Sequence, residues 1–260
     1  MTAVYQVTRN IAIPTSYAGG PWSPSVQHGA ALAGLVTWAA EQIQVSPPMH
    51  IVRITIEFLR PAPIRAMEIK TDVDRAGRKA HMVTIRLISD GVELVRARVL
   101  RMRSADLGFP ANQSNIPLNV SGPDMAYDDP EINENPNPFF SGVSMRFARE
   151  IERRPGYGAV WLRIIRSFIE GEQISPVVRA AIAADFTSGP SAIVDFNSWS
   201  YANSDLSIFL TRPPADDWIL LNAEAWLGEH GTAIASSRLA DARGYFGRAT
   251  QTCLIEPRQL

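Results

Sequence analysis

Few residues of this chain carry the thiol or imidazole groups that act as nucleophiles or metal ligands, and they lie far apart in the sequence. Cys253 is the only cysteine, and the chain has four histidines. The apolar residues after Cys253 indicate a buried thiol, because a nucleophilic thiolate needs a polar, electropositive neighbourhood. His28 and Gly29 begin an apolar segment, where the histidine could cap a helix or contact a ligand. No group of His, Cys, Asp and Glu has metal-ligand spacing, so we predict no metal and no other cofactor.

Three polar residues of the second half occur in unusual settings. Asp185 lies between an apolar segment and the Gly189-Pro190 turn, and Gln251 interrupts an apolar strand-like segment. A buried amide needs hydrogen-bond partners, so Gln251 could join two elements or serve a site. Asn203 precedes an alternating segment and could be a turn residue. Phosphate-binding glycine motifs and a G-x-S-x-G sequence are missing, which argues against nucleotide-loop proteins and α/β-type serine hydrolases.

The composition is that of an ordinary globular protein. The chain has 260 residues, 46% of them hydrophobic, and 25 basic and 26 acidic residues give a formal net charge of −1. A nucleic-acid-binding surface usually appears as a basic excess, which this chain lacks. The N-terminal segment has no secretory pattern, and the longest apolar stretch is far below the ~20 residues that cross a bilayer. We therefore expect a soluble, cytoplasmic protein without a membrane span.

The chain matches itself at an offset of 152 residues, which indicates an internal duplication. Three dipeptides recur in register: Arg60-Pro61 as Arg212-Pro213, Arg86-Leu87 as Arg238-Leu239, and Arg96-Ala97 as Arg248-Ala249. Between the halves lies a segment rich in proline, Asn, Asp and Ser, a composition that disfavours helices and central strands. We therefore predict one domain at 1–104, a linker at 105–140 and a second domain at 141–260.

Each half is predicted to contain one buried helix followed by antiparallel strands. Ser23-Pro24 gives a start signal for the first helix, whose small apolar residues begin at His28-Gly29 and run until Ser46. Ser175-Pro176 gives the start signal for the second helix. Strands are predicted from alternating or β-branched residues, with Asp90-Gly91 as a hairpin turn. Their ranges are 51–58, 67–74, 81–88 and 92–102 in the first half, and 205–210, 218–226, 232–239 and 245–255 in the second. The fold class is therefore α+β, with sheets wrapped around buried helices.

The order of these segments resembles a known family. A small apolar helix, a strand ending in FLRP and a long meander resemble the hotdog thioesterase superfamily. In the second half AADFTSGP, NSDLSIFLTRPP and GRATQT resemble the bacterial thioesterase II-like (TesB-like) double-hotdog acyl-CoA thioesterases. The resemblance covers nearly the whole chain except the linker. It implies two antiparallel sheets joined into one continuous sheet, an acyl-CoA substrate, a place in fatty acid metabolism, and a homo-oligomer.

The resemblance also implies site residues. In this family an Asp, a Thr or Ser, and a Gln orient the water that attacks a thioester. Asp185 and Gln251 match the first and last, with a one-residue adjustment in the strand of Gln251. Asn203 stands where the hydroxyl residue is expected, and Ser204 could supply that hydroxyl if the strand is offset by one residue. His28 and Gly29 stand where related enzymes contact substrate.

Three functions follow as hypotheses. The first is hydrolysis of acyl-CoA, with Asp185 as general base and the two amides holding the water. The second is a non-catalytic acyl-CoA or lipid-binding protein, in which Asn203 marks a lost site. A hydratase or dehydratase ranks last, because no Asp and His occur in one segment near a helix. Arg60 and Arg212 are expected to end strands and bind backbone or carboxylates, with a contact to CoA phosphate as the alternative.

Overall fold

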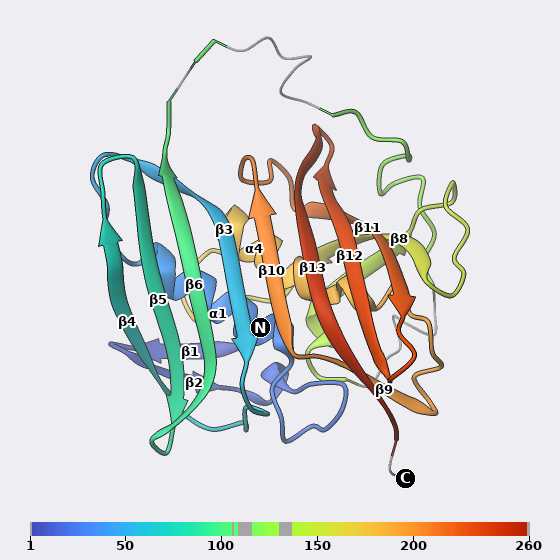
Figure 1. Ribbon diagram of the computed structural model, residues 1–260, viewed down its shortest axis with the longest axis horizontal. Coiled ribbons are helices and arrows are strands. Elements are labelled where there is room, and N and C mark those ends of the chain that lie inside the picture. The colour runs from blue at the N-terminus through green and yellow to red at the C-terminus, as the bar shows by residue number, and fades with distance from the viewer. Residues whose placement is uncertain (1, 106, 109–115, 130–136, 259–260) are drawn as a thin grey trace.

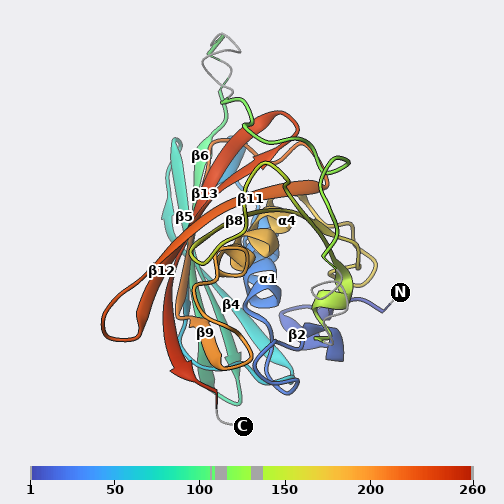
Figure 2. The same cartoon turned by 90° about the vertical axis from the view of Figure 1, so that its right-hand side faces the viewer.

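The structure, a computed structural model, describes residues 2–105, 107–108, 116–129 and 137–258. It consists of a long antiparallel sheet with two helices against one face (Figures 1 and 2). The helical elements are η1 (Ser16–Ala18), α1 (Gly29–Glu41), η2 (Phe140–Gly142), α4 (Pro176–Ala184) and η3 (Asp185–Ser188). The strands are β1 (Tyr5–Thr8), β2 (Ile11–Pro14), β3 (Met49–Phe58), β4 (Met67–Ala76), β5 (Ala80–Ser89), β6 (Val92–Arg103), β7 (Val143–Phe147), β8 (Tyr157–Ile164), β9 (Trp199–Asn203), β10 (Asp205–Leu210), β11 (Trp218–Leu227), β12 (Thr232–Asp241) and β13 (Gly244–Pro257).

The 13-stranded sheet is continuous across the two copies of the repeat. Its order is β1-β2-β4-β5-β6-β3-β10-β13-β12-β11-β8-β7, and β9 pairs with β13. The first copy, α1 with β3–β6, meets the second copy, α4 with β10–β13, where β3 pairs with β10 (Figure 1). This is the double-hotdog arrangement that the resemblance implied. Residues 106, 109–115 and 130–136 of the predicted linker lie outside the described residues, and the domain bounds stay a prediction.

The two helices are buried because their residues are small and apolar. Ten of the thirteen residues of α1 are buried, from Ala30 to Ala40. Gly34 lets α1 approach α4 closely, since a β-carbon there would come within 2.8 Å of Ile182 Cγ1. One apolar core, formed by both helices and by strands of both copies, therefore supports the whole sheet.

The first helix begins at His28-Gly29, as predicted, and not at the Ser23-Pro24 signal. Helix α1 begins at Gly29 with His28 as its N-cap, and it ends at Glu41, before Ser46. The Ser23-Pro24 signal fails because the chain forms a turn there, with Val26 N donating to Ser23 O at 3.2 Å, and then pairs outside the helix. The amide of Gln27 donates to Ala62 O and that of His28 to Ala18 O, so neither takes part in a helix. Ser175 does cap α4, as predicted, with its side chain accepting from Val178 N.

The predicted strands are confirmed, with ends that shift by up to two residues. Asp90 and Gly91 both have positive φ, at 51° and 76°, as a two-residue hairpin turn requires. Strands β1, β2, β7, β8 and β9 were not predicted. Residues of β3, β5 and β6 lie 152 positions before the equivalent residues of β10, β12 and β13. The N-caps of the two helices, His28 and Ser175, are only 147 positions apart. The loop after α4 is therefore longer than its counterpart.

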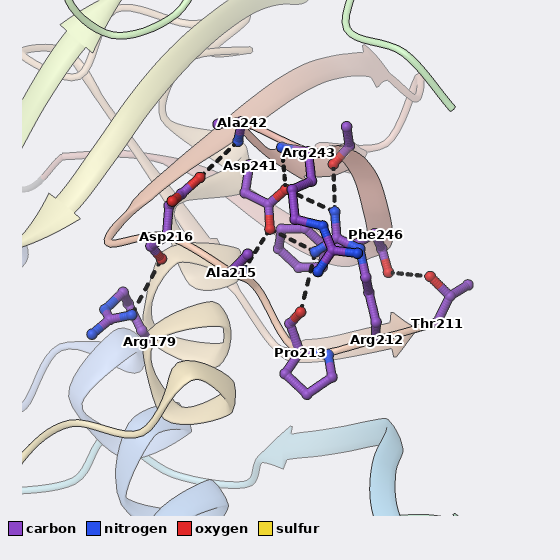
Figure 3. A network of polar contacts seen from close by, with 11 residues as sticks. Arg179, Thr211, Arg212, Pro213, Ala215, Asp216, Asp241, Ala242, Arg243 and Phe246 are labelled. Atoms are coloured by element: carbon purple, nitrogen blue, oxygen red, sulfur yellow. Dashed lines mark hydrogen bonds and ion pairs between the residues drawn. The ribbon is translucent and has the colours of Figure 1, made fainter. Parts of the chain in front are cut away.

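Arg212 ends β10 in a buried ion pair, as one of the predicted alternatives held (Figure 3). Its guanidinium donates to both carboxylate oxygens of Asp241, at 2.6 and 2.7 Å. The same carboxylate accepts from the backbone amides of Ala215 and Arg243. Asp241 is fully buried, so this network fixes the turn after β10 to the β12–β13 hairpin. The backbone amide of Arg60 donates to Leu94 O at 3.2 Å, and its guanidinium makes a long contact of 3.4 Å to Glu93 O.

Candidate active site

Asp185 lies at the centre of the predicted site. It is the C-cap of α4 and the first residue of η3, and it is only 5% exposed. A carboxylate this buried needs hydrogen bonds or a favourable field to remain charged. Both come from neighbouring elements, as follows.

Two side-chain amides hold the carboxylate on one side. Asn203 Nδ2 donates to Asp185 Oδ1 at 2.9 Å. Gln251 Nε2 donates to the carbonyl of Asp185 at 2.9 Å and lies 3.4 Å from Oδ1. The oxygen of the fully buried Gln251 accepts from Ser188 N at 3.2 Å, so both ends of the amide are used. The structure thus brings the three predicted residues together.

The N-terminus of α1 lies on the other side of the carboxylate. A β-carbon on Gly29 would come 2.7 Å from Asp185 Oδ2 and 2.8 Å from Oδ1. The positive end of a helix dipole stabilises a negative charge at this place. Glycine at position 29 therefore provides the space that the carboxylate occupies, and the first copy contributes to a site whose other residues lie in the second.

His28 is held in one tautomer. Its Nδ1 accepts from Ala30 N at 3.0 Å, so in the neutral ring the proton is on Nε2. Nδ1 also lies 3.4 Å from Asp185 Oδ2. We interpret this second contact as a juxtaposition and not as an ion pair, because the lone pair of Nδ1 already caps the helix. Oδ2 is consequently free to accept a proton from a small molecule.

Aromatic rings fix the plane of His28, and sequence reasoning missed them. Phe139 stacks on the imidazole with centroids 4.9 Å apart, and Phe186 stacks at 5.1 Å. Phe140 lies 5.8 Å away. The only signal in the sequence was the position of Phe186 beside Asp185 in AADF, since Phe139 is more than a hundred residues from His28.

Ser204 is not part of the site. It is exposed, and its backbone pairs on both sides, with its amide donating to Thr252 O and its carbonyl accepting from Phe58 N. It separates β9 from β10, so the offset that would have turned its hydroxyl inward does not occur. Cys253 is buried as predicted, and burial, reinforced by Asp185 and Asp205, raises the pKa of its thiol to about 12. A thiolate nucleophile is thereby excluded.

Sequence profiles identify the family. The acyl-CoA thioesterase N-terminal domain matches residues 18–102, and the acyl-CoA thioesterase C-terminal domain matches residues 119–255. The chain belongs to the acyl-CoA thioesterase family. It is therefore a thioester hydrolase. No curated protein matches this thioesterase in sequence.

Solved structures share the thioesterase's fold at low identity. A proposed thioesterase from Novosphingobium aromaticivorans is 19% identical with a TM-score of 0.75, covering 98% of this chain and 99% of that one. A protein with a hot dog fold from Alicyclobacillus acidocaldarius is 13% identical at 0.75, covering 96% and 93%. The acyl-CoA thioesterase II TesB2 from Mycobacterium marinum is 16% identical at 0.68, covering 96% and 94%. These likenesses confirm the predicted double-hotdog class.

The equivalent place in the first copy of this thioesterase lacks all the polar groups. Trp38 stands 147 positions before Asp185, while Ile51 and Val99 stand 152 positions before Asn203 and Gln251. The register supports this equivalence, because Ile51 pairs with Arg101 as Asn203 pairs with Cys253. Of the two equivalent places, only the one at Asp185 combines a carboxylate with two amides.

Among the described residues, no helix is long and apolar enough to cross a membrane. Within the same residues, no three His, Cys, Asp or Glu side chains are grouped as metal ligands would be.

Proposed function

We propose that this chain hydrolyses acyl-CoA thioesters and that Asp185 is the general base. The proposal rests on the different surroundings of the two carboxylate oxygens of Asp185. Both oxygens lie against the start of α1. Oδ1 accepts from Asn203 and lies beside Gln251, whereas Oδ2 has no protein donor among the described residues. A carboxylate held by one oxygen presents the other to a water molecule.

The reaction follows from this arrangement. Asp185 Oδ2 takes a proton from the water as the water oxygen attacks the carbonyl carbon of the thioester. The tetrahedral intermediate then expels the CoA sulfur, which receives the proton from Asp185. One water is consumed, and a free acid and CoA are formed. General-base assistance of this kind is typically worth about 10²–10⁴ in rate.

The first amide of α1 is suited to stabilise the oxyanion. Ala30 N is used by His28 Nδ1, and Ala31 N donates to His28 O. The amide of Gly29 makes no such bond among the described residues and lies at the positive end of the helix. A backbone donor aimed at a developing oxyanion contributes several kcal/mol to catalysis, about 3 in a measured case. His28 Nε2–H is a second donor with a fixed ring plane.

Asn203 replaces the hydroxyl residue of related proteins without removing the hydrogen bond to Asp185. Its amide donates to Oδ1 as a hydroxyl would, and this favours the enzyme over the non-catalytic binding protein. We also propose an acyl-CoA substrate, a cytoplasmic location, a role in fatty acid metabolism and a homo-oligomer, which the family resemblance implies.

Thiol release from a panel of acyl-CoAs, from acetyl to palmitoyl with benzoyl, tests the proposal. We expect wild type to turn over at least one member, and Asp185→Asn to lower kcat by about 10²–10⁴ while keeping acyl-CoA binding. The control is Asp124→Asn, whose side chain is 97% exposed and which should act as wild type. Full activity in Asp185→Asn would refute the role of the base. Acyl-CoA binding without turnover in wild type would establish the binding protein instead.

A further inference from the structure

Two aromatic side chains and one arginine form an exposed cluster near the candidate site, and a third exposed aromatic side chain follows three residues after one of them. Trp22, Phe196 and Trp199 are 38%, 37% and 39% exposed. The rings of Trp22 and Phe196 meet edge to face at 6.0 Å, and the Arg258 guanidinium lies 5.5 Å from the Trp22 ring. We call these four residues the aromatic rim. Large rings gathered at a surface next to a cation are typical of a binding site and not of an ordinary solvated surface.

The rim is held in place by a turn. The carboxylate of Asp195 accepts from Asn197 N at 2.9 Å and from Ser198 Oγ at 3.1 Å, and its carbonyl accepts from Trp199 N at 3.0 Å. These bonds place Phe196 and Trp199 at the two ends of one turn. Such preorganisation reduces the entropy lost when a ligand binds.

Arg258 ties the turn to the loop that carries Trp22. Its backbone amide donates to Ser198 O at 2.9 Å, and its guanidinium donates to Phe196 O at 3.0 Å and Pro21 O at 3.4 Å. A guanidinium has five N–H donors, so further donors remain for a phosphate. The rim thus joins three distant parts of the sequence around one cation.

The rim is connected to the candidate site along β9. Trp199, Tyr201 and Asn203 alternate on one face of this strand, and Tyr201 contacts Phe196 at 6.2 Å between ring centroids. Trp199 and Asn203 are about 13 Å apart at 3.3 Å per residue. The loop of Trp22 leads directly into His28. Tyr201 itself is buried, so a ligand that spans from Asp185 to the rim does not lie on its ring. Such a ligand must cover at least the distance from Asn203 to Trp199, as the extended pantetheine arm of CoA can.

We propose that the aromatic rim binds the adenine nucleotide end of CoA. Adenine stacks on indole and phenyl rings, and Arg258 binds a phosphate, since guanidinium matches phosphate geometry. The acyl chain would bind weakly at the rim. An apolar chain gains most binding free energy in an enclosed pocket and none from a nearby cation. This inference rests on the proposed function, as it assigns the other end of the same substrate.

The test compares one acyl group on two carriers, CoA and pantetheine, which lacks the nucleotide. We expect Trp22→Ala and Arg258→Ala to lower kcat/KM for the acyl-CoA, Trp22→Ala by roughly 5- to 150-fold, as for base stacking on an aromatic ring. With acyl-pantetheine, both variants should stay within about twofold of wild type. Trp22→Phe should recover most of the loss. Matched controls are Trp226→Ala, an exposed tryptophan on β11, and Arg78→Ala, an exposed arginine outside the rim.

Equal losses on both carriers, or none on either, would overturn the inference. Titration with 3′,5′-ADP, followed by tryptophan fluorescence or calorimetry, gives a readout that needs no turnover. We expect wild type to bind it and both Trp22→Ala and Arg258→Ala to bind at least about fivefold more weakly. Failure of the proposed function would appear separately, as nucleotide binding at the rim with no hydrolysis of either thioester.

Discussion

The carboxylate of Asp185 lies directly against the α-carbon of Gly29, at the point where the second helix ends and the first begins. The space between them is too small for a methyl group, because a β-carbon would come 2.7 and 2.8 Å from the two oxygens. Position 29 therefore determines where the carboxylate can lie.

Gly29→Ala should move Asp185 and reduce activity. A displacement of about 1 Å in a catalytic group costs on the order of 10²-fold in rate, so kcat should fall by about this factor. Thiol-release kinetics measure the effect. Gly122→Ala is the control, because its added methyl group meets nothing within 4 Å. Equal kcat in Gly29→Ala and wild type would show that the carboxylate is not used where the structure places it.

Asn203→Ala should lower kcat by about 10- to 150-fold, because it removes a hydrogen bond to a charged group worth about 1.5–3 kcal/mol. KM should change little if Asn203 acts through Asp185. Asn203→Thr should retain more activity than Asn203→Ala, since a hydroxyl can donate to Oδ1. Asn10→Ala is a matched control, as the Asn10 side chain donates to Glu68 in a long, exposed bond of 3.4 Å. Alanine and threonine variants of equal activity would contradict this role.

Asp241→Asn should destabilise the fold without touching the site. Breaking a buried ion pair costs about 3–5 kcal/mol, measured as the free energy of unfolding in urea. Burial raises the pKa of Asp241, but Arg212 and two backbone amides outweigh it, so the net shift is downward. The contribution of the Asp241 carboxylate to the free energy of unfolding is therefore present above its unfolded-state pKa. It is lost as the pH falls through its folded-state pKa. Asp90→Asn, in the exposed pair with Arg65, should cost below about 1 kcal/mol.

His81→Gln should reduce the acid sensitivity of the fold. Burial, and secondarily Arg101, lower the pKa of His81, so the unfolded chain binds a proton before the folded chain does. Stability is thus lost as pH falls through the unfolded-state pKa, and the loss ends at the folded-state pKa. Unfolding in urea at pH 7.5 and pH 5 should show a smaller difference for the variant. His230→Gln, at an exposed position, should behave as wild type; an identical pH difference in His81→Gln would contradict the argument.

The sequence predicted the repeat, both buried helices and eight strands, because these depend on local patterns of apolar residues. The Ser23-Pro24 signal did not start α1, since a local signal cannot show that Gln27 and His28 donate their amides to Ala62 and Ala18. Strands such as β9 were missed because they are short and partly polar. Their pairing depends on partners far along the chain.

The candidate site was predictable in its residue types and not in its geometry. Asp185, Gln251 and Asn203 were found through resemblance, and the choice between Asn203 and Ser204 needed the register of β9. The Phe139–His28–Phe186 stack could not be predicted, because it joins three segments that only the folded chain brings together.

The site is divided between the two copies, with His28 and Gly29 on α1 and the other residues in the second copy. A ligand bound there recognises only the arrangement in which α1, α4 and the β3–β10 pair are all docked. By mass action, a ligand at one hundred times its Kd adds about 2.7 kcal/mol to that arrangement. At the proposed site, substrate and product would act as reversible cross-links between the copies, and the resistance of the chain to unfolding should rise with the concentration of either.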